Sequence, residues 1–214
     1  MNLLIMGPAG SGKGTMSAKI VEDFPIPHIS TGDMLRSTVA SGSELGQKVK
    51  EIMDQGKLVS DEIILEMVKE RISQADCKEG FLFDGFPRTI VQAKALDTML
   101  TEMNREIDTV INLTVDFEAL ADRITGRRLC PNCGEIYHIS TKPSKVEGVC
   151  DVCGHDLIQR SDDTVEQLKV RLAEHDKLTK PVLDYYSSKD VVRDVNASQS
   201  VENVYSDIKQ ELTK

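Results

Sequence analysis

Residues 7–15 have the composition of a phosphate-binding loop. They read Gly-Pro-Ala-Gly-Ser-Gly-Lys-Gly-Thr and stand between a short apolar run and a helix-like segment. Glycines let successive backbone N–H groups turn toward phosphate oxygens, the helix N-terminus adds partial positive charge, and Lys13 adds a full one. The hydroxyl that usually follows the lysine and helps to hold Mg²⁺ is displaced by one place, from Gly14 to Thr15. A glycine turn without a ligand is the simpler alternative, and the position between strand and helix argues against it.

Asp84 is a second candidate, directly after the apolar run Phe81-Leu82-Phe83. The carboxyl end of a buried parallel strand is where open α/β sheets bind ligands. A carboxylate at this edge can hold Mg²⁺ through water, because Mg²⁺ usually keeps part of its hydration shell. The alternative is an aspartate that caps the following turn.

Four of the five cysteines form two Cys-x-x-Cys pairs, each followed by glycine. The pairs are Cys130 with Cys133 and Cys150 with Cys153, and sixteen residues separate them. This spacing is typical of a Zn²⁺ site in which four thiolates complete a tetrahedron. Such a shell leaves no position for water, so the predicted role is structural, in a segment too short to fold on its own core. Disulfides or free thiols are the alternatives.

Three further residues could join this chemistry but are not needed for it. His138 and His155 lie close enough in the sequence to be rival ligands, and a fourth cysteine makes them unnecessary. We expect both at the surface. Cys77 stands outside the cluster and is expected to be a small side chain at or near a helix end.

The elements that must position these residues alternate along the chain. Apolar runs typical of buried strands occur at residues 2–6, 81–83, 110–113 and 191–195, and helical patterns occur at residues 13–24 and after Ser60, Asp116 and Thr164, the last helix ending near Lys180-Pro181. Alternating strands and helices predict an α/β fold with a parallel sheet. Residues 30–59, which are helix-forming, and residues 127–163, which hold the cysteine pairs, interrupt this pattern and are predicted to be inserts.

Composition excludes several classes of protein. The chain has 214 residues, of which 40% are hydrophobic and 29% charged, and a formal net charge of −9. These values are typical of a globular protein with one main domain, and the negative charge argues against nucleic acid as a partner. The first apolar run is far too short for an export signal or a membrane span. We expect a cytoplasmic monomer with no membrane partner.

Five motifs, taken in order, resemble those of bacterial adenylate kinases of the long-lid, zinc-binding type. They are Gly10–Thr15, Ser30–Arg36, Asp84–Thr89, Gly126–Arg128 and Arg160–Asp163. The resemblance implies a P-loop NTPase-like parallel sheet flanked by helices. Residues 1–29, 60–126 and 164–214 would form the core, residues 30–59 a small helical insert that binds a nucleoside monophosphate, and residues 127–163 a zinc-bearing lid that excludes water when it closes.

The same resemblance implies reversible, Mg²⁺-dependent phosphoryl transfer from ATP to AMP, which gives two ADP. ATP would be bound by Gly10, Ser11, Gly12, Lys13, Gly14, Thr15, Arg123, Arg127, Ile136, Tyr137 and Gln199. AMP would be bound by Thr31, Arg36, Lys57, Leu58, Val59, Gly85, Phe86, Pro87, Arg88, Gln92, Arg160 and Arg171. Lys13, Arg88, Arg123, Arg160 and Arg171 would be catalytic, and Asp84 would hold Mg²⁺ through water. Positioning and charge neutralisation carry such a reaction, so no general base is needed.

Two alternatives compete with this interpretation. A kinase for another nucleoside monophosphate, or one that uses GTP as donor, would share most of the motifs. A zinc-ribbon nucleic-acid module attached to a P-loop ATPase would also contain four cysteines, but the chain lacks a basic surface pattern rich in aromatic residues.

Overall fold

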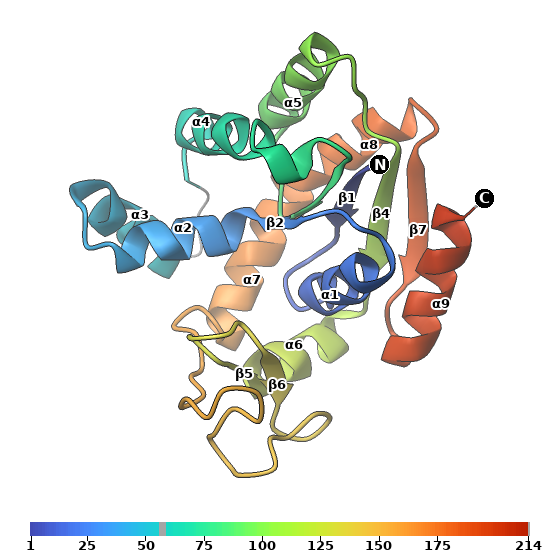
Figure 1. The fold of residues 1–214 in the computed structure, drawn as a ribbon. Coiled ribbons are helices and arrows are strands. Elements are labelled where there is room, and N and C mark those ends of the chain that lie inside the picture. Colours follow the sequence, from blue (N-terminus) through green and yellow to red (C-terminus); the bar gives the residue numbers. More distant parts are fainter. Residues whose placement is uncertain (56–58, 214) are drawn as a thin grey trace.

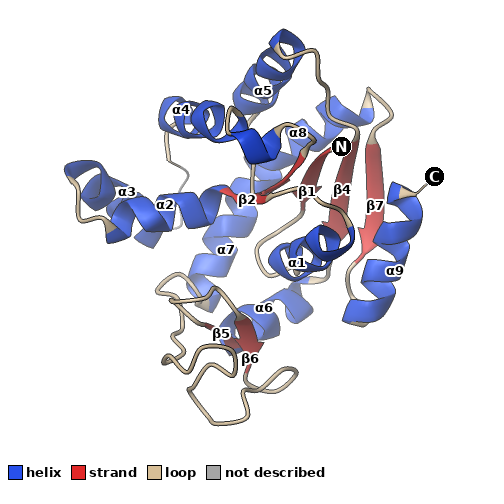
Figure 2. Cartoon of the chain, viewed as in Figure 1, coloured by secondary structure: helices blue, strands red, loops and turns tan. Residues whose placement is uncertain are grey.

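A five-stranded parallel sheet forms the centre of the protein. The computed structural model describes residues 1–55 and 59–213, and Figures 1 and 2 show their arrangement. The strands are β1 (Asn2–Met6), β2 (His28–Ser30), β3 (Phe81–Asp84), β4 (Thr109–Thr114) and β7 (Val192–Asn196). Their order in the sheet is β2-β3-β1-β4-β7, and every neighbouring pair is parallel. The predicted α/β class with a parallel sheet is confirmed.

Helices cover both faces of this sheet. They are α1 (Lys13–Asp23), α2 (Thr31–Ala40), α3 (Glu44–Asp54), α4 (Asp61–Ile72), α5 (Ile90–Glu102), α6 (Phe117–Gly126), α7 (Val165–Glu174), α8 (Lys180–Ser187) and α9 (Val201–Leu212), with a 3₁₀ turn at Ala75–Cys77 and a π-helical turn at His175–Thr179. Leu3 and Ile5 of β1 pack with α1 and α9, whereas Leu4 and Met6 pack with α4, α5 and α8. Burial on both faces explains why residues 3–6 of β1 are all apolar instead of alternating.

Two elements differ from the sequence expectations. The helix that follows Thr164 does not end near Lys180-Pro181. It passes through the π-helical turn directly into α8, and Pro181 stands in the first turn of α8, immediately after the π-helical turn. The short strand β2 was not predicted, since it has three residues at the edge of the sheet and only Ile29 is buried.

The two predicted inserts contain their own small structures. Helices α2 and α3 pack against each other within residues 30–55. Residues 127–163, here named the cysteine segment, contain a separate antiparallel pair, β5 (Arg127–Leu129) and β6 (Ile136–His138). Figure 1 shows the two segments extending from different sides of the main sheet. Among the described residues, none of the helices has the length and apolar character required to span a bilayer.

Candidate functional site

The glycine loop lies between β1 and α1 and needs its glycines. Gly10 and Gly12 have φ values of +83° and +94°, in the left-handed region that glycine adopts most easily. A Cβ on Gly10 would also approach the Cγ1 atom of Ile124 to 2.9 Å. The ammonium group of Lys13 donates hydrogen bonds to the carbonyl oxygens of Gly7 at 2.9 Å and of Pro8 at 2.8 Å. The ammonium group of Lys13 therefore lies against the start of the glycine loop.

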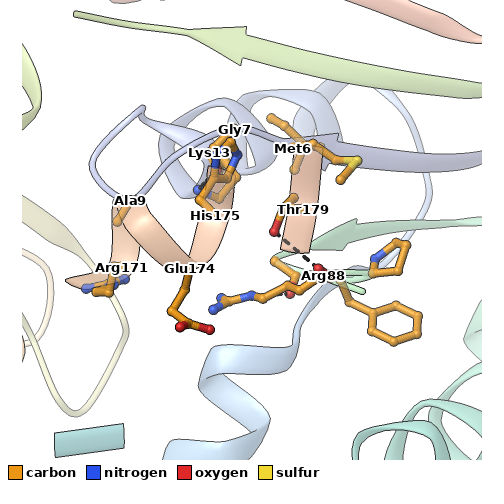
Figure 3. Close-up of a pocket in the computed structure, with 13 residues that line it drawn as sticks. Met6, Gly7, Ala9, Lys13, Arg88, Arg171, Glu174, His175 and Thr179 are labelled. Carbon is orange, nitrogen blue, oxygen red and sulfur yellow. Dashed lines mark hydrogen bonds between the residues drawn. The ribbon is translucent and has the colours of Figure 1, made fainter. Parts of the chain in front are cut away.

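A pocket opens beside this loop (Figure 3). It is lined by Ile5, Met6, Gly7, Ala9, Lys13, Gly85, Phe86, Pro87, Arg88, Arg171, Glu174, His175 and Thr179. The cationic side chains of Lys13, Arg88 and Arg171 come from three separate stretches of sequence. Glu174 and His175 were not predicted, and their positions three and four residues after Arg171, on the same helix face, are the signal that could have found them.

A second pocket adjoins the first. It is lined by Thr31, Gly32, Leu35, Arg36, Met53, Val59, Ile64, Gly85, Arg88, Gln92, Asp162 and Arg171. Gly85, Arg88 and Arg171 line both pockets. The second pocket combines an apolar wall with cationic and amide groups, which suits a ligand that has an anionic end and a planar polar ring.

Gly85 joins the two pockets through its carbonyl oxygen. This oxygen accepts hydrogen bonds from the Thr31 hydroxyl at 3.0 Å and from Arg88 Nε at 2.8 Å. The φ of Gly85 is +77°, and a Cβ there would come within 2.9 Å of an Arg88 guanidinium nitrogen. The turn after β3 thus requires glycine and fixes the position of Arg88.

The pockets hold positive charge that is only partly compensated. Burial lowers the pKa of Lys13 to about 8, with a further contribution from Arg88, although Asp84 opposes the shift. Burial and the neighbouring Arg171 lower the pKa of Arg88 to about 10, and burial and Arg36 lower that of Arg160 to about 10. The cations destabilise one another, so a polyanion placed among them would be strongly stabilised.

Proton uptake upon nucleotide binding is one expected consequence of this lowered pKa. At pH 8.5 most Lys13 side chains of the free protein are neutral, and a triphosphate beside Lys13 favours the charged form. Binding of a non-hydrolysable ATP analogue should therefore take up a proton at pH 8.5 and take up none through Lys13 at pH 6.5. Calorimetry in two buffers with different ionisation enthalpies measures this number, and Lys13→Arg should abolish the uptake. Equal uptake in the Arg variant would contradict the assignment to Lys13.

Asp84 lies at the carboxyl end of β3, beside the glycine loop. Its Oδ2 atom is 3.6 Å from His28 Nε2 and 3.8 Å from the position that a Cβ on Gly14 would occupy. Burial alone would raise the pKa of Asp84, but the contact with His28 and the charge of Lys13 hold it below the usual range. An ionised carboxylate at this position fits water-mediated binding of Mg²⁺. His28 was not predicted because it belongs to the short strand β2.

Aspartates accompany four of the other predicted arginines. Arg171 donates to Asp162 at 2.8 Å, and Arg127 Nε donates to the buried Asp163 at 2.9 Å. The Oδ1 atom of Asp33 accepts a hydrogen bond from Arg36 Nε at 3.1 Å and lies 3.7 Å from Arg160 Nη2. Asp33 therefore links α2 to the cysteine segment. These aspartates stand within the motifs identified from the sequence, but no role was predicted for them.

The predicted ATP-binding residues outside the glycine loop do not line either of the two pockets. Arg123 donates to the carbonyl oxygen of Ala197 at 2.8 Å, and Gln199 donates to that of Asn196 at 3.1 Å. The Cδ1 atom of Ile136 lies 3.5 Å from the Cβ position at Gly14, which brings the cysteine segment against the glycine loop. Tyr137 is buried and its hydroxyl accepts the N–H of Asp151 at 2.8 Å, so its side chain points into the cysteine segment.

Two predicted AMP-binding residues, Lys57 and Leu58, lie outside the described residues. Val59, the third residue of that stretch, is buried and lines the second pocket. Phe86 and Pro87 line the first pocket instead of the second.

The four paired cysteines converge within the cysteine segment. Their sulfur atoms all lie within 4.8 Å of one another, and no disulfide joins any of the five cysteines. The Sγ atoms of Cys130 and Cys153 are 3.3 Å apart, and those of Cys133 and Cys150 are 3.5 Å apart. Sulfur atoms at the corners of a zinc tetrahedron stand about 3.8 Å apart, so the donor set and its spacing fit a four-coordinate metal ion. Cys77 is buried at the end of the 3₁₀ turn, as expected.

The two histidines of this segment behave differently. His155 is exposed, as predicted. The prediction for His138 was wrong, because it is buried, with Nε2 3.1 Å from the carbonyl oxygen of Asp122 and Nδ1 accepting the N–H of Thr141 at 3.2 Å. Gly126 leaves the space for its ring, since a Cβ there would lie 2.1 Å from Nε2. No pattern in the sequence indicates that a glycine twelve residues away packs against this ring.

Comparisons with known proteins agree with this geometry. The family profile described as adenylate kinase matches residues 5–191. An adenylate kinase of Carboxydothermus hydrogenoformans is 52% identical over 214 residues, which is the full length of both chains. One of Desulforamulus reducens is 51% identical over 208 residues, covering 97% of this chain and 98% of the relative. One of Archaeoglobus fulgidus is 49% identical over 214 residues, covering 100% of this chain and 99% of the relative. A glycine loop beside a cationic double pocket, together with similarity along the whole sequence, means that the chain belongs to the adenylate kinase family.

Proposed function

We infer that the protein transfers a phosphoryl group reversibly from ATP to AMP, giving two ADP. Family membership supports the reaction. The observation that carries it in this chain is that two pockets, one beside a phosphate-binding loop and one with an apolar wall, share Arg88 and Arg171. A phosphoryl group that passes between two bound nucleotides must cross such a shared boundary.

The proposed roles follow from this arrangement. Residues 10–15 and Lys13 in particular would hold the β- and γ-phosphates of ATP, while Arg36 and Arg88 would hold the phosphate of AMP in the second pocket. Arg171 and Arg160, released from their aspartates, would neutralise charge on the transferring group. Positioned cations of this kind supply most of the acceleration in phosphoryl transfer. Arg123, Arg127, Ile136, Tyr137 and Gln199 would complete the ATP site when the cysteine segment approaches.

Mg²⁺ would be held with ATP and, through water, by Asp84. When bound, it neutralises charge on the phosphate oxygens. The chain's own contribution is to keep Asp84 ionised and to hold it next to the loop, which the contact with His28 and the charge of Lys13 support.

The division into a core, a monophosphate-binding insert at residues 30–59 and a lid at residues 127–163 belongs to the same proposal. The lid would exclude water until both nucleotides are bound, which suppresses hydrolysis of ATP. A structural Zn²⁺ on the four cysteines would let the cysteine segment move as one rigid body. The contact between Arg160 and Asp33 supports an approach of the two inserts to each other.

A coupled assay of ADP formation tests the function. ATP with AMP should give ADP at the highest kcat/KM, and CMP, UMP and GMP should be poor acceptors. Replacing ATP with GTP compares the two donors. Absence of ADP from ATP and AMP would overturn the proposal, and a clear preference for another monophosphate would favour the alternative kinase.

We further expect a monomer in the cytoplasm. Five cysteines without a disulfide are typical of a reducing compartment. Light scattering coupled to gel filtration measures the oligomeric state.

A further inference from the structure

The side-chain amide of Gln92 is held in one orientation. Gln92 is only 2% exposed and lines the second pocket. Its Oε1 atom accepts the backbone N–H of Arg88 at 2.7 Å, and its Nε2 atom donates to Oδ1 of Asp61 at 2.7 Å. A carboxylate only accepts hydrogen bonds and a backbone N–H only donates them. If the amide rotated by 180°, its oxygen would face the Asp61 carboxylate, and its NH₂ group would face the N–H of Arg88. Neither pair can form a hydrogen bond.

Asp61 is itself fixed at the junction of two helices. It stands in the first turn of α4, and its Oδ2 atom accepts a hydrogen bond from the Thr89 hydroxyl at 3.0 Å. The same hydroxyl caps α5 by accepting the N–H of Gln92 at 3.1 Å. Both carboxylate oxygens are thus engaged, and Asp61 does not line the pocket. Of the two residues that Asp61 holds, Gln92 lines the pocket and Thr89 does not, so Gln92 is the direct route by which Asp61 can affect a ligand.

The fixed amide leaves a defined pattern for the ligand. A primary amide has two N–H donors and two lone pairs, and one of each is used by Asp61 and Arg88. One donor and one acceptor remain. The six-position edge of adenine offers the complement, with N1 as acceptor and the N6 amino group as donor. A 6-oxopurine such as hypoxanthine reverses both groups, with N1–H as donor and O6 as acceptor.

We propose that Asp61 is a positioning residue that selects a 6-aminopurine over a 6-oxopurine in the acceptor nucleotide by fixing the orientation of Gln92. The inference rests on the proposed AMP site and deepens it, because it assigns base selection to a residue that does not touch the base. Binding sites that match substrate donors and acceptors reject reversed analogues strongly, since buried polar groups are then left unpaired.

Asp61→Leu tests this role, with AMP and IMP as acceptors. The ratio of kcat/KM for AMP to that for IMP should fall at least about tenfold. Without the carboxylate, the Gln92 amide can rotate to pair with IMP, and only the N–H of Arg88 then loses its hydrogen-bond acceptor. Asp61→Asn keeps an acceptor oxygen for Gln92 and should retain most of the ratio. Glu62→Leu is the matched control, since Glu62 is exposed in the same helical turn. The KM for ATP should stay unchanged in all three variants.

Failure of the inference and failure of the AMP site are distinguishable. If Gln92→Leu lowers AMP use but Asp61→Leu keeps the wild-type AMP-to-IMP ratio, the role of Asp61 is wrong and the site stands. If Gln92→Leu leaves AMP use unchanged, both are wrong. A measurement on the wild-type chain covers the case in which Asp61→Leu does not fold. The side-chain NH₂ protons of Gln92 should exchange slowly with solvent by NMR, and exchange as fast as that of an exposed glutamine would overturn the inference.

Discussion

Lys13→Met is expected to lower kcat by about 10³-fold while the protein stays folded. The ammonium group of Lys13 stands over the glycine loop, where it would meet the phosphates of ATP. Methionine has similar length and no charge, so it removes the stabilisation of the transferring group and little packing. Steady-state kinetics at saturating ATP and AMP measure the loss.

The stability of this variant gives an independent check. The pKa of Lys13 lies near 8 in the folded chain and near 10.5 in the unfolded chain. The unfolded chain therefore binds more protons between these values, and burial of the charged lysine destabilises the protein at neutral pH. Lys13→Met should not lower Tm at pH 7. The matched control is Lys19→Met on the same helix, outside both pockets, and its kcat should stay near the wild-type value. A kcat of Lys13→Met within tenfold of wild type would contradict the role.

Cys130→Ser is expected to produce the largest loss of stability. Cys130 is fully buried among the other three cysteines, and a hydroxyl does not replace a thiolate as a zinc ligand. The free energy of metal binding contributes directly to folding of such a segment. A loss of about 3 kcal/mol would lower Tm by roughly 6–12 °C in a chain of this size. Calorimetry measures Tm, and elemental analysis should find one zinc per wild-type chain and less in the variant.

Cys77→Ser provides the control for this experiment. Cys77 is equally buried but lies outside the cluster, so this variant should keep its zinc. Prolonged treatment of the wild-type protein with a chelator should reproduce the lowered Tm of Cys130→Ser. At low temperature, where the segment stays folded, both forms should retain activity. A wild-type protein without bound metal, together with an unchanged Tm in Cys130→Ser, would disprove the zinc site.

Much of the fold could be predicted because local patterns and tertiary packing agree. The buried strand β1 and the helix after the glycine loop start where the apolar run and the glycines place them. The strand β2 and the continuation of α7 through a π-helical turn could not be predicted. A three-residue strand has too few positions for a pattern, and the turn depends on how α7 and α8 pack against the rest of the chain.

The candidate site shows the same limit. Motifs identified Lys13, Arg88 and Arg171, which do line one pocket. They did not identify Asp61 or His28. The importance of these two residues depends on their contacts with Gln92 and Asp84, which belong to other elements. They also failed for His138, because its burial depends on the absence of a side chain at Gly126. Residues that act through a neighbour leave little trace in a single sequence.

The π-helical turn at His175–Thr179 has a consequence for tolerated changes in chain length. It separates Arg171, which faces the pockets, from Val182 and Tyr186, which are fully buried against the sheet. Each residue in a helix turns the chain by about 100°. Insertion of a further residue between them would turn Arg171 by about this angle relative to Val182 and Tyr186, and would move either Arg171 away from the phosphates or the apolar side chains out of the core. This stretch therefore tolerates an added residue poorly, and substitution of Thr179 would also remove the hydrogen bond that its hydroxyl donates to the carbonyl oxygen of Arg88.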